Sequence, residues 1–374
     1  MINCDFSDAP YIDPAAMPIL SFVIMARNDD YMGNAKWRLE TTLNFLSESL
    51  FAIGRLNEAE IVVVDWQSNI PLYKDLSVSD KSKQIIRYII VPETLPGTTI
   101  FKCDFPRPVI LNVGIRRSRG QYIVQTLGDV LWTEDTLLKL FNLIEKKTLS
   151  TALVDESLIV IGRKELPYDM VKCNPSIDCL ATYIKGQDSI IEDIPPTPYL
   201  LVPADSFMMH RNLWFECRAF DERLQYWGWS DCDLILRMRL KYSVICKKDF
   251  EDLHVYHLNH ISPEHVEVIN TRKTNPWLFN NFTVNLPEWG LAATSFHEYP
   301  SSSTALNLAE TVKSPVFISV YRLRHLLNIL IFFVSNINWP NTKLVILLLL
   351  HMCVSFPELK IRYRARYLFT RGAS

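Results

Sequence analysis

The chain has 374 residues, 48% hydrophobic and 21% charged, with a formal net charge of −2, which suits one large domain with an appendage or two ordinary domains. No run reaches the ~18–20 uninterrupted apolar residues of a spanning helix, and the acidic, proline-bearing N-terminus lacks the basic start and apolar core of a signal peptide. Residues 315–374 hold eight basic residues and one acidic residue, a net charge of +7, so the preceding part carries −9.

The first 130 residues alternate between strand-like and helix-like segments. Ile19–Met25 and Ile61–Val64 are continuous apolar runs of strand length, and residues 36–53 between them carry apolar residues at helical spacing. The pattern continues with a strand, a helix and a strand, predicted at Ile85–Val91, Val109–Arg117 and Tyr122–Thr126. Strands that alternate with helices predict an α/β fold with a mostly parallel central sheet and helices on both faces.

The second half of the chain is less regular. Residues 151–198 are a mixed region with several prolines, after which short strands are predicted at Asp205–His210, Val244–Cys246 and Leu253–Leu258. Asp231 is positioned like the N-cap of a helix whose apolar side follows it. Residues 262–314 are expected to be rich in loops, and residues 315–374 are expected to form two or three apolar and basic helices.

Polar residues follow three of the predicted strands directly. They are Arg27-Asn28-Asp29, Asp65-Trp66-Gln67 and Gly128-Asp129. Ligands of such sheets bind beyond the carboxyl ends of the strands, so the three segments are expected to open onto one crevice. Asp129 is a lone carboxylate between two apolar stretches, which is costly to bury unless it binds a cation or a partner.

These segments resemble the nucleotide-sugar-binding half of family-2-like glycosyltransferases with the GT-A fold. The resemblance is carried, in chain order, by residues 21–28, 62–65, 112–117, 120–123 and 128–129. A second cluster, residues 220–222 and 227–233, resembles the acceptor half of these enzymes, in which a tryptophan-glycine segment precedes the catalytic carboxylate. Here that segment reads Trp-Gly-Trp-Ser-Asp and is similar to the corresponding segment of galactosyltransferase-like C-terminal regions.

The resemblance implies a role for each matching residue. It implies that the nucleotide sugar is bound by Ala26, Arg27, Asn28, Asp65, Asn112, Arg116, Gly128 and Asp129. It implies acceptor binding by Trp227, Gly228 and Trp229, with Asp231 as the general base and Asp233 as the second candidate. The expected organisation is an N-terminal extension (1–18), a GT-A domain (19–265, divided at 132/133), a loop-rich connection (266–314) and a helical tail (315–374).

A divalent ion is expected beside Asp129. Transfer from a nucleoside diphosphate builds negative charge on the leaving pyrophosphate, which a metal neutralises as a Lewis acid. Asp129 and one histidine of the cluster at 254, 257 and 260, with His257 preferred, are the expected ligands of Mn²⁺ or Mg²⁺. His254 and His257 are expected to point to opposite faces of their strand. Relatives commonly carry a second carboxylate two residues before this position, where this chain has Leu127. Asp129 is therefore expected to be the only carboxylate ligand of this loop, and metal binding is expected to depend more on histidine and on pyrophosphate oxygens.

Each of these residues also has a structural interpretation that the sequence leaves open. Asp129 could cap the helix that starts near Thr133, and Asp231 could be an ordinary N-cap. Trp227 and Trp229 could belong to the core, although aromatic residues around a glycine also suit stacking on a sugar. The arginines at 116, 117 and 119 could form a solvated helix face.

The sequence therefore predicts a glycosyltransferase that moves a sugar from a nucleotide-sugar donor to a hydroxyl of a glycan or lipid-linked glycan, with inversion. The alternative is a catalytically silent relative that binds a nucleotide or glycan. Eight scattered cysteines without a CxxC pair favour a reducing compartment, hence a cytoplasmic protein. The basic, apolar tail is expected to touch the inner face of a membrane, and no nucleic-acid partner is expected.

Overall fold

A computed structural model of the chain describes residues 17–95, 101–149, 152–188, 191–194, 205–239, 242–246, 253–261, 272–275 and 285–300. The predicted tail at 315–374 and most of the predicted connection at 266–314 lie outside the described residues. Within the described residues, no helix combines the length and apolar character needed to cross a membrane.

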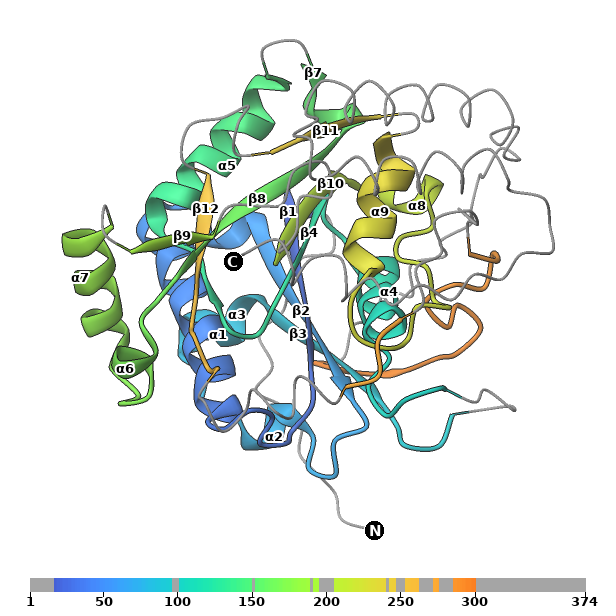
Figure 1. The fold of residues 1–374 in the computed structure, drawn as a ribbon, viewed down its shortest axis with the longest axis horizontal. Helices are drawn as coiled ribbons and strands as arrows, with labels where there is room; N and C mark the ends of the chain where they lie inside the picture. Colours follow the sequence, from blue (N-terminus) through green and yellow to red (C-terminus); the bar gives the residue numbers. More distant parts are fainter. Residues whose placement is uncertain are drawn as a thin grey trace, which may run out of the picture.

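Most strands of the described residues belong to one mixed sheet (Figure 1). They are β1 (Leu20–Ala26), β2 (Ala59–Trp66), β3 (Ile86–Val91), β4 (Tyr122–Thr126), β5 (Val130–Leu131), β8 (Ser157–Glu165), β9 (Glu192–Ile194), β10 (Ser206–His210), β11 (Ser243–Ile245), β12 (His254–His257) and β13 (His297–Tyr299). The order is β13-β3-β2-β1-β4-β10-β8-β12-β5, and β9 and β11 also pair with β8. β6 (Thr148–Leu149) and β7 (Ala152–Leu153) form a separate pair.

The centre of the sheet is parallel. β3, β2, β1 and β4 all run the same way, and β10 enters antiparallel between β4 and β8. Beyond it, β12 and β11 run parallel to β8. The carboxyl ends of β4, β8 and β12 therefore carry the residues from which the candidate site is built.

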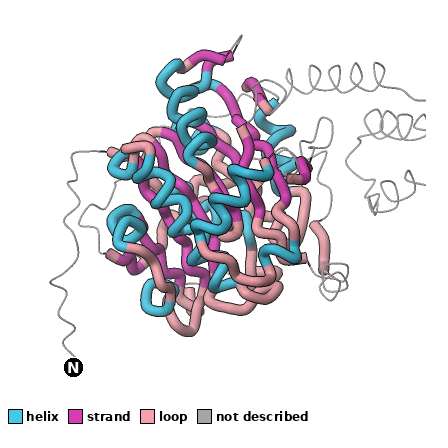
Figure 2. Tube along the Cα trace, turned by 90° about the vertical axis from the view of Figure 1, so that its left-hand side faces the viewer, coloured by secondary structure: helices cyan, strands magenta, loops and turns pink. Residues whose placement is uncertain are grey.

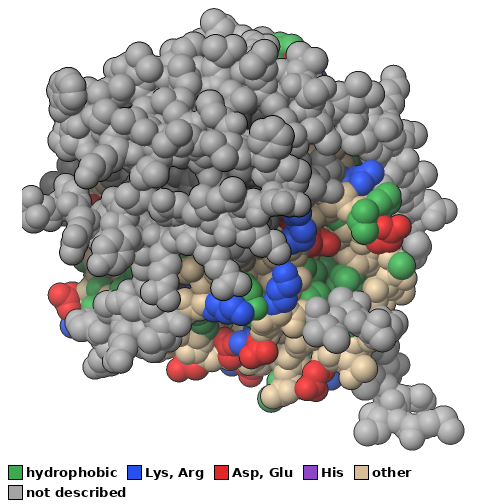
Figure 3. Space-filling model, turned by 45° about the vertical axis from the view of Figure 1, so that its right-hand side comes forward, with side chains coloured by type: hydrophobic (Ala, Val, Ile, Leu, Met, Phe, Trp, Pro, Cys, Tyr) green, Lys and Arg blue, Asp and Glu red, His purple; other side chains and the backbone are tan. Residues whose placement is uncertain are grey.

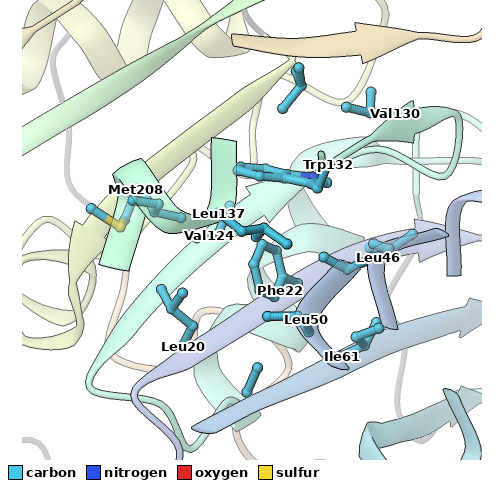
Figure 4. Packing of buried hydrophobic residues seen from close by; sticks show 14 of the residues in the cluster. Leu20, Phe22, Leu46, Leu50, Ile61, Val124, Val130, Trp132, Leu137 and Met208 are labelled. Atoms are coloured by element: carbon cyan, nitrogen blue, oxygen red, sulfur yellow. The ribbon is translucent and has the colours of Figure 1, made fainter. Parts of the chain in front are cut away.

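Helices cover both faces of this sheet, as Figures 1 and 2 show. The helices are α1 (Ala35–Ala52), α2 (Leu72–Asp75), α3 (Asp80–Ile85), α4 (Arg107–Arg117), α5 (Glu134–Lys146), α6 (Tyr168–Val171), α7 (Ile177–Gln187), α8 (Arg211–Glu216) and α9 (Ser230–Arg239), with 3₁₀ turns at Leu56–Glu58 and Val154–Glu156. The core on the α1 and α5 face includes Phe22 and Trp132, whose rings meet edge to face at 5.1 Å (Figure 4). A second core lies under α4, α8 and α9.

The predicted α/β class, with a mostly parallel sheet between layers of helices, is confirmed. The predicted strands and helices of the first 130 residues all form, with their ends displaced by at most two residues. The prediction for Asp231 as an N-cap is wrong, because α9 begins at Ser230 and Asp231 lies within its first turn. On the face seen in Figure 3, described basic side chains lie next to acidic ones, as on most globular surfaces.

Gly114 allows α4 to lie directly on the sheet. A Cβ atom at this position would lie 2.5 Å from Cγ1 of Val23 and 2.8 Å from Cγ2 of Val64. Both valines belong to the central strands, so any larger residue would push α4 away from β1 and β2.

A buried ion-pair cluster ties the strands together at the opposite end from the candidate site. Glu60 on β2 accepts hydrogen bonds from the Ser21 hydroxyl (2.6 Å) and the Arg119 backbone amide (2.6 Å), and it pairs with Arg87 on β3 at 3.3 Å. Arg87 also pairs with Glu298 on β13 at 3.0 Å. Burial raises the pKa of Glu60, but Arg87 and the two hydrogen bonds outweigh burial and hold it below its usual value.

We expect Glu60→Gln to lower the free energy of unfolding by about 3 kcal/mol at pH 7, because it leaves Arg87 with one buried partner fewer. A carboxyl whose pKa is lowered by folding stabilises the protein above its unfolded pKa of 4.5, and this contribution is lost as the pH falls. The difference between the variant and the wild type should therefore narrow below about pH 4.5. Urea unfolding at pH 7 and pH 4 measures both effects.

The matched control for this variant is Glu58→Gln, because Glu58 makes a partly exposed pair with Arg55 at 2.8 Å. Its cost should stay below about 1 kcal/mol. Equal costs for the two variants would contradict the importance of the buried cluster.

Candidate metal and nucleotide site

The pairing of β5 with β12 brings Asp129 to the histidine cluster. His257 is the register partner of Val130, and the Leu258 backbone amide donates to the Asp129 carbonyl at 2.8 Å. Asp129 follows β4 by three residues, and His257 is the last residue of β12. Two segments that are 128 residues apart in the chain are thus fixed side by side through backbone hydrogen bonds.

Asp129, His257 and His260 form a cluster with metal-ligating geometry. Nε2 of His257 lies 3.6 Å and Nε2 of His260 lies 3.2 Å from Oδ2 of Asp129, and the three ligand atoms all lie within 4.8 Å of one another. The other carboxylate oxygen, Oδ1, is buried without a hydrogen-bond partner among the described residues. A buried, unpaired carboxylate oxygen is a group that a cation would satisfy, so the residues present fit a divalent ion.

The charges of the cluster are coupled. Burial alone raises the pKa of the Asp129 carboxyl, but His257 and His260 outweigh it and hold that pKa well below its usual range. Burial lowers the pKa of His257, whereas Asp129 and Glu165 raise it, with a net value of about 9. Arg38, buried beneath the cluster, places Nε 4.0 Å from the same Asp129 oxygen. The surroundings therefore supply positive charge to one ionised carboxylate.

The donor set differs from the one that the sequence predicted. Asp129 and His257 are brought together as expected, but His260, which the prediction left unassigned within the histidine cluster, joins them. The signal that could have found it is the spacing His257-Leu-Asn-His260 immediately after a strand. One carboxylate and two imidazoles favour Mn²⁺ or another transition metal over Mg²⁺, which prefers oxygen ligands.

Other features separate Asp129 from the structural alternative. The helix behind it, α5, is capped by Thr133, whose hydroxyl accepts from the Thr136 amide at 3.2 Å. Asp129 is therefore not the cap of that helix. The preceding residue, Gly128, lies close to α1, because a Cβ atom at this position would lie 3.1 Å from Cδ1 of Leu39. Leu127 packs against the hydrophobic core and offers no ligand atom.

His254 lies on the other face of β12, as expected from strand alternation. Its Nε2 is 2.9 Å from the Tyr256 hydroxyl and 3.5 Å from Oδ1 of Asp188. This places His254 in a separate polar cluster with Lys164, away from Asp129.

The residues after β1 and β2 do meet at one edge of the sheet. Ala26 is the last residue of β1. The Asn28 amide donates to the Ser68 hydroxyl at 2.7 Å, and that hydroxyl hydrogen-bonds Asp65, which also accepts from the Leu72 amide at 2.8 Å. Burial raises the pKa of Asp65, although these two bonds oppose it.

Arg27 lies at the rim of the same edge. It pairs with Asp29 at 2.6 Å and its guanidinium lies 5.4 Å from the centre of the Phe105 ring. The segment that contains Phe105 leads directly into α4, so Arg27 also borders the start of that helix.

The α4 residues Asn112 and Arg116 have protein partners. Asn112 donates to the Phe220 carbonyl at 2.8 Å and accepts from the Phe220 amide at 3.0 Å. Arg116 donates to the Pro287 and Trp289 carbonyls and lies over the Trp289 ring. Both side chains are buried, so the solvated helix face is not what forms here.

The two candidate bases have different surroundings. Asp233 is buried in an ion pair with Arg237 at 2.7 Å, and Arg237 also donates to the Cys217 and Ala219 carbonyls. Asp231 is half-buried, and burial raises the pKa of its carboxyl, with Arg107 lowering it and Asp205 raising it. Asp233 therefore stabilises α9 through this pair, whereas among the described residues no arginine forms an ion pair with the Asp231 carboxylate.

The turn before Asp231 is strained. Gly228 and Trp229 both have positive φ, 77° and 67°, and Trp229 pays a steric cost for it. The Asn275 amide holds the turn by donating to the Tyr226 and Gly228 carbonyls at 2.6 Å each. Trp227 is 41% exposed and so is not a core residue.

We expect His260→Ala to weaken the binding of Mn²⁺ by roughly tenfold or more, since loss of even an outer-shell partner costs about that much. His254→Ala is the matched control, because it removes an imidazole from the opposite face of β12. Isothermal titration of Mn²⁺ into each purified variant measures the dissociation constants. Equal losses in both variants would contradict a site at Asp129.

No protein-family model matches the sequence, and no curated protein matches it. Among solved structures, the chain is similar to residues 1–349 of TarS from S. aureus, with a TM-score of 0.40 and 17% identity over 64% of this chain and 60% of that chain. The same TarS segment in complex with UDP has a TM-score of 0.40 and 14% identity, over 63% of this chain and 59% of that chain. A third structure, of TarS, has a TM-score of 0.39 and 16% identity, over 64% of this chain and 36% of that chain. The chain therefore spans at most 60% of the length of these structures.

Proposed function

We propose that the chain is a GT-A-type glycosyltransferase that moves a sugar from a nucleotide-sugar donor to a hydroxyl of a glycan or lipid-linked glycan, with inversion. The observation that carries this proposal is the Asp129, His257 and His260 cluster beyond the carboxyl end of β4, in the same sheet as the Asp65 and Asn28 loops. Ligands of parallel sheets bind at this edge. The order of the matching segments along the chain supports the same conclusion.

Asp129, His257 and His260 would hold a divalent ion, Mn²⁺ in preference to Mg²⁺. When bound, such an ion neutralises the charge that develops on the diphosphate leaving group. Asn28 and Asp65, at the carboxyl ends of β1 and β2, are proposed to receive the nucleotide, with Arg27 at their rim and with Ala26 and Gly128 as further proposed contacts. Asn112 and Arg116 are proposed to act at this site through the segments that they anchor.

The proton of the acceptor hydroxyl is proposed to pass to Asp231. As the hydroxyl oxygen bonds to the anomeric carbon, the bond from that carbon to the diphosphate oxygen breaks, and the proton moves to the carboxylate. Burial raises the pKa of Asp231, which makes it a stronger base than an exposed aspartate. Since one base on one face suffices for a single displacement, the anomeric configuration inverts. Trp227, with its exposed ring, is proposed to stack on the acceptor sugar together with the Gly228-Trp229 turn.

The rest of the proposed setting depends on the sequence alone. We propose a cytoplasmic protein whose residues 315–374, with a net charge of +7, contact an anionic membrane surface. Such contact would bring the enzyme to a lipid-linked acceptor.

We expect Asp231→Asn to lower the turnover number by about 10²–10⁴-fold without weakening nucleotide binding, because the variant removes the proton acceptor alone. Asp233→Asn should instead lower the free energy of unfolding, since it breaks the buried pair with Arg237. Donor consumption and urea unfolding of both variants separate the two roles. An unchanged turnover number in Asp231→Asn would contradict the role of Asp231 as the general base.

A ligand screen tests the competing view of a silent nucleotide-binding relative, which the leucine at 127 favours. Nucleoside diphosphates and nucleotide sugars are added with and without Mn²⁺, and the melting temperature is recorded. A ligand at 100 times its dissociation constant adds about 2.7 kcal/mol of stability, so we expect one nucleotide to raise the melting temperature only when Mn²⁺ is present. A shift that does not depend on metal would favour the silent relative.

A further inference from the structure

Two side chains on one face of β8 connect the two halves of the site. Arg163 and Glu165 alternate with Lys164, so both face His257, whereas Lys164 faces Asp188 on the other side. Glu165 is the register partner of His257 on the neighbouring parallel strand. Neither residue was singled out by the sequence.

Glu165 fixes the orientation of His257. Its Oε1 lies 2.7 Å from Nδ1 of His257, while Arg163 places Nη2 3.0 Å from the same nitrogen. A carboxylate accepts and a guanidinium only donates, so the shorter contact to Glu165 requires the proton on Nδ1. Nε2 is then left to face Asp129, as in metal sites where a carboxylate orients a ligating histidine.

Arg163 links this pair to the other half of the site. Its Nε donates to Glu165 at 2.8 Å, and its Nη1 pairs with Asp205, immediately before β10, at 2.8 Å. The charge of Asp205 in turn contributes to raising the pKa of the Asp231 carboxyl, after burial as the main cause. One partly buried guanidinium therefore holds both Glu165, the partner of a metal-site histidine, and Asp205.

We propose that Glu165 and Arg163 are positioning residues that hold His257 in its metal-binding orientation and tie it to Asp205, immediately before β10. Neither residue touches substrate, and both act through His257. This inference rests on the proposed metal site.

The test titrates Mn²⁺ alone into the full chain and follows the electron paramagnetic resonance signal of the free ion. Glu165→Gln should weaken Mn²⁺ binding about 10–100-fold, the usual cost of losing an outer-shell partner. Arg163→Lys should weaken it roughly tenfold, since an ammonium cannot hold Glu165 and Asp205 in the same planar geometry. Lys164→Gln is the matched control from the opposite face, and its dissociation constant should stay unchanged even if its melting temperature falls.

The outcomes are distinct. An unchanged dissociation constant in folded Glu165→Gln, with normal binding by the wild type, overturns the inference and leaves the proposed function standing. Equal weakening by Lys164→Gln also overturns it, because the effect would then belong to β8 as a whole. If the wild type binds Mn²⁺ and the variants weaken it but no donor is consumed, the inference stands and the proposed transfer fails. If the wild type does not bind Mn²⁺, both fail.

Discussion

The partly buried charge of Asp129 constrains the whole edge of the sheet on which it lies. An ionised carboxylate in a poorly solvated position is costly unless opposite charge and hydrogen bonds compensate it. Here the compensation comes from β12, since its pairing with β5 fixes both the Asp129 carbonyl and the imidazole of His257. Without this short pairing, the Asp129 carboxylate would not be held next to His257, and the segment after β4 would not be joined to β12.

Two arginines of α4 attach an irregular C-terminal segment to the sheet domain. Arg117 donates to the Gly290, Leu291 and Thr294 carbonyls, and Arg116 holds the Pro287 and Trp289 carbonyls. Backbone carbonyls of an irregular segment need donors when they are buried. These contacts dock residues 285–296 on α4 and deliver β13 to the edge strand β3. Arg116, which the resemblance assigned to the nucleotide sugar, and its neighbour Arg117 here donate hydrogen bonds to backbone carbonyls.

The parts of the structure that were predictable from sequence are those with local causes. A strand that is buried on both faces is a continuous apolar run, as in β1, β2 and β4. A helix that is buried on one face, such as α1, has apolar residues at helical spacing. Both patterns can be recognised in the sequence. Asp129 was also recognised from the sequence as a candidate site residue, because it is a charged residue between two apolar stretches. The sequence did not reveal β13, whose three residues owe their conformation to β3.

Side-chain partnerships were the least predictable part. Glu165 meets His257 only because β8 and β12 lie parallel in one register, and nothing in the sequence fixes the register of strands 92 residues apart. Likewise, the resemblance ranked Asp231 before Asp233 as the general base, but only the position of Arg237 one helical turn after Asp233 shows that Asp233 is held in an ion pair. A pair four residues apart on a helix was a signal that could have been used.

In the proposed metal site, a leucine at 127 in place of a second carboxylate would change the net charge as well as the number of ligands. A divalent ion with one carboxylate and two neutral imidazoles keeps a net charge of +1, whereas a second carboxylate would cancel it. The more positive site attracts a diphosphate more strongly and holds the ion alone less strongly. Affinity for metal and affinity for diphosphate then become coupled, and by linkage each ligand must tighten the other by the same factor. The same substitution that favours a silent relative therefore also suits an enzyme that takes up its metal together with its donor.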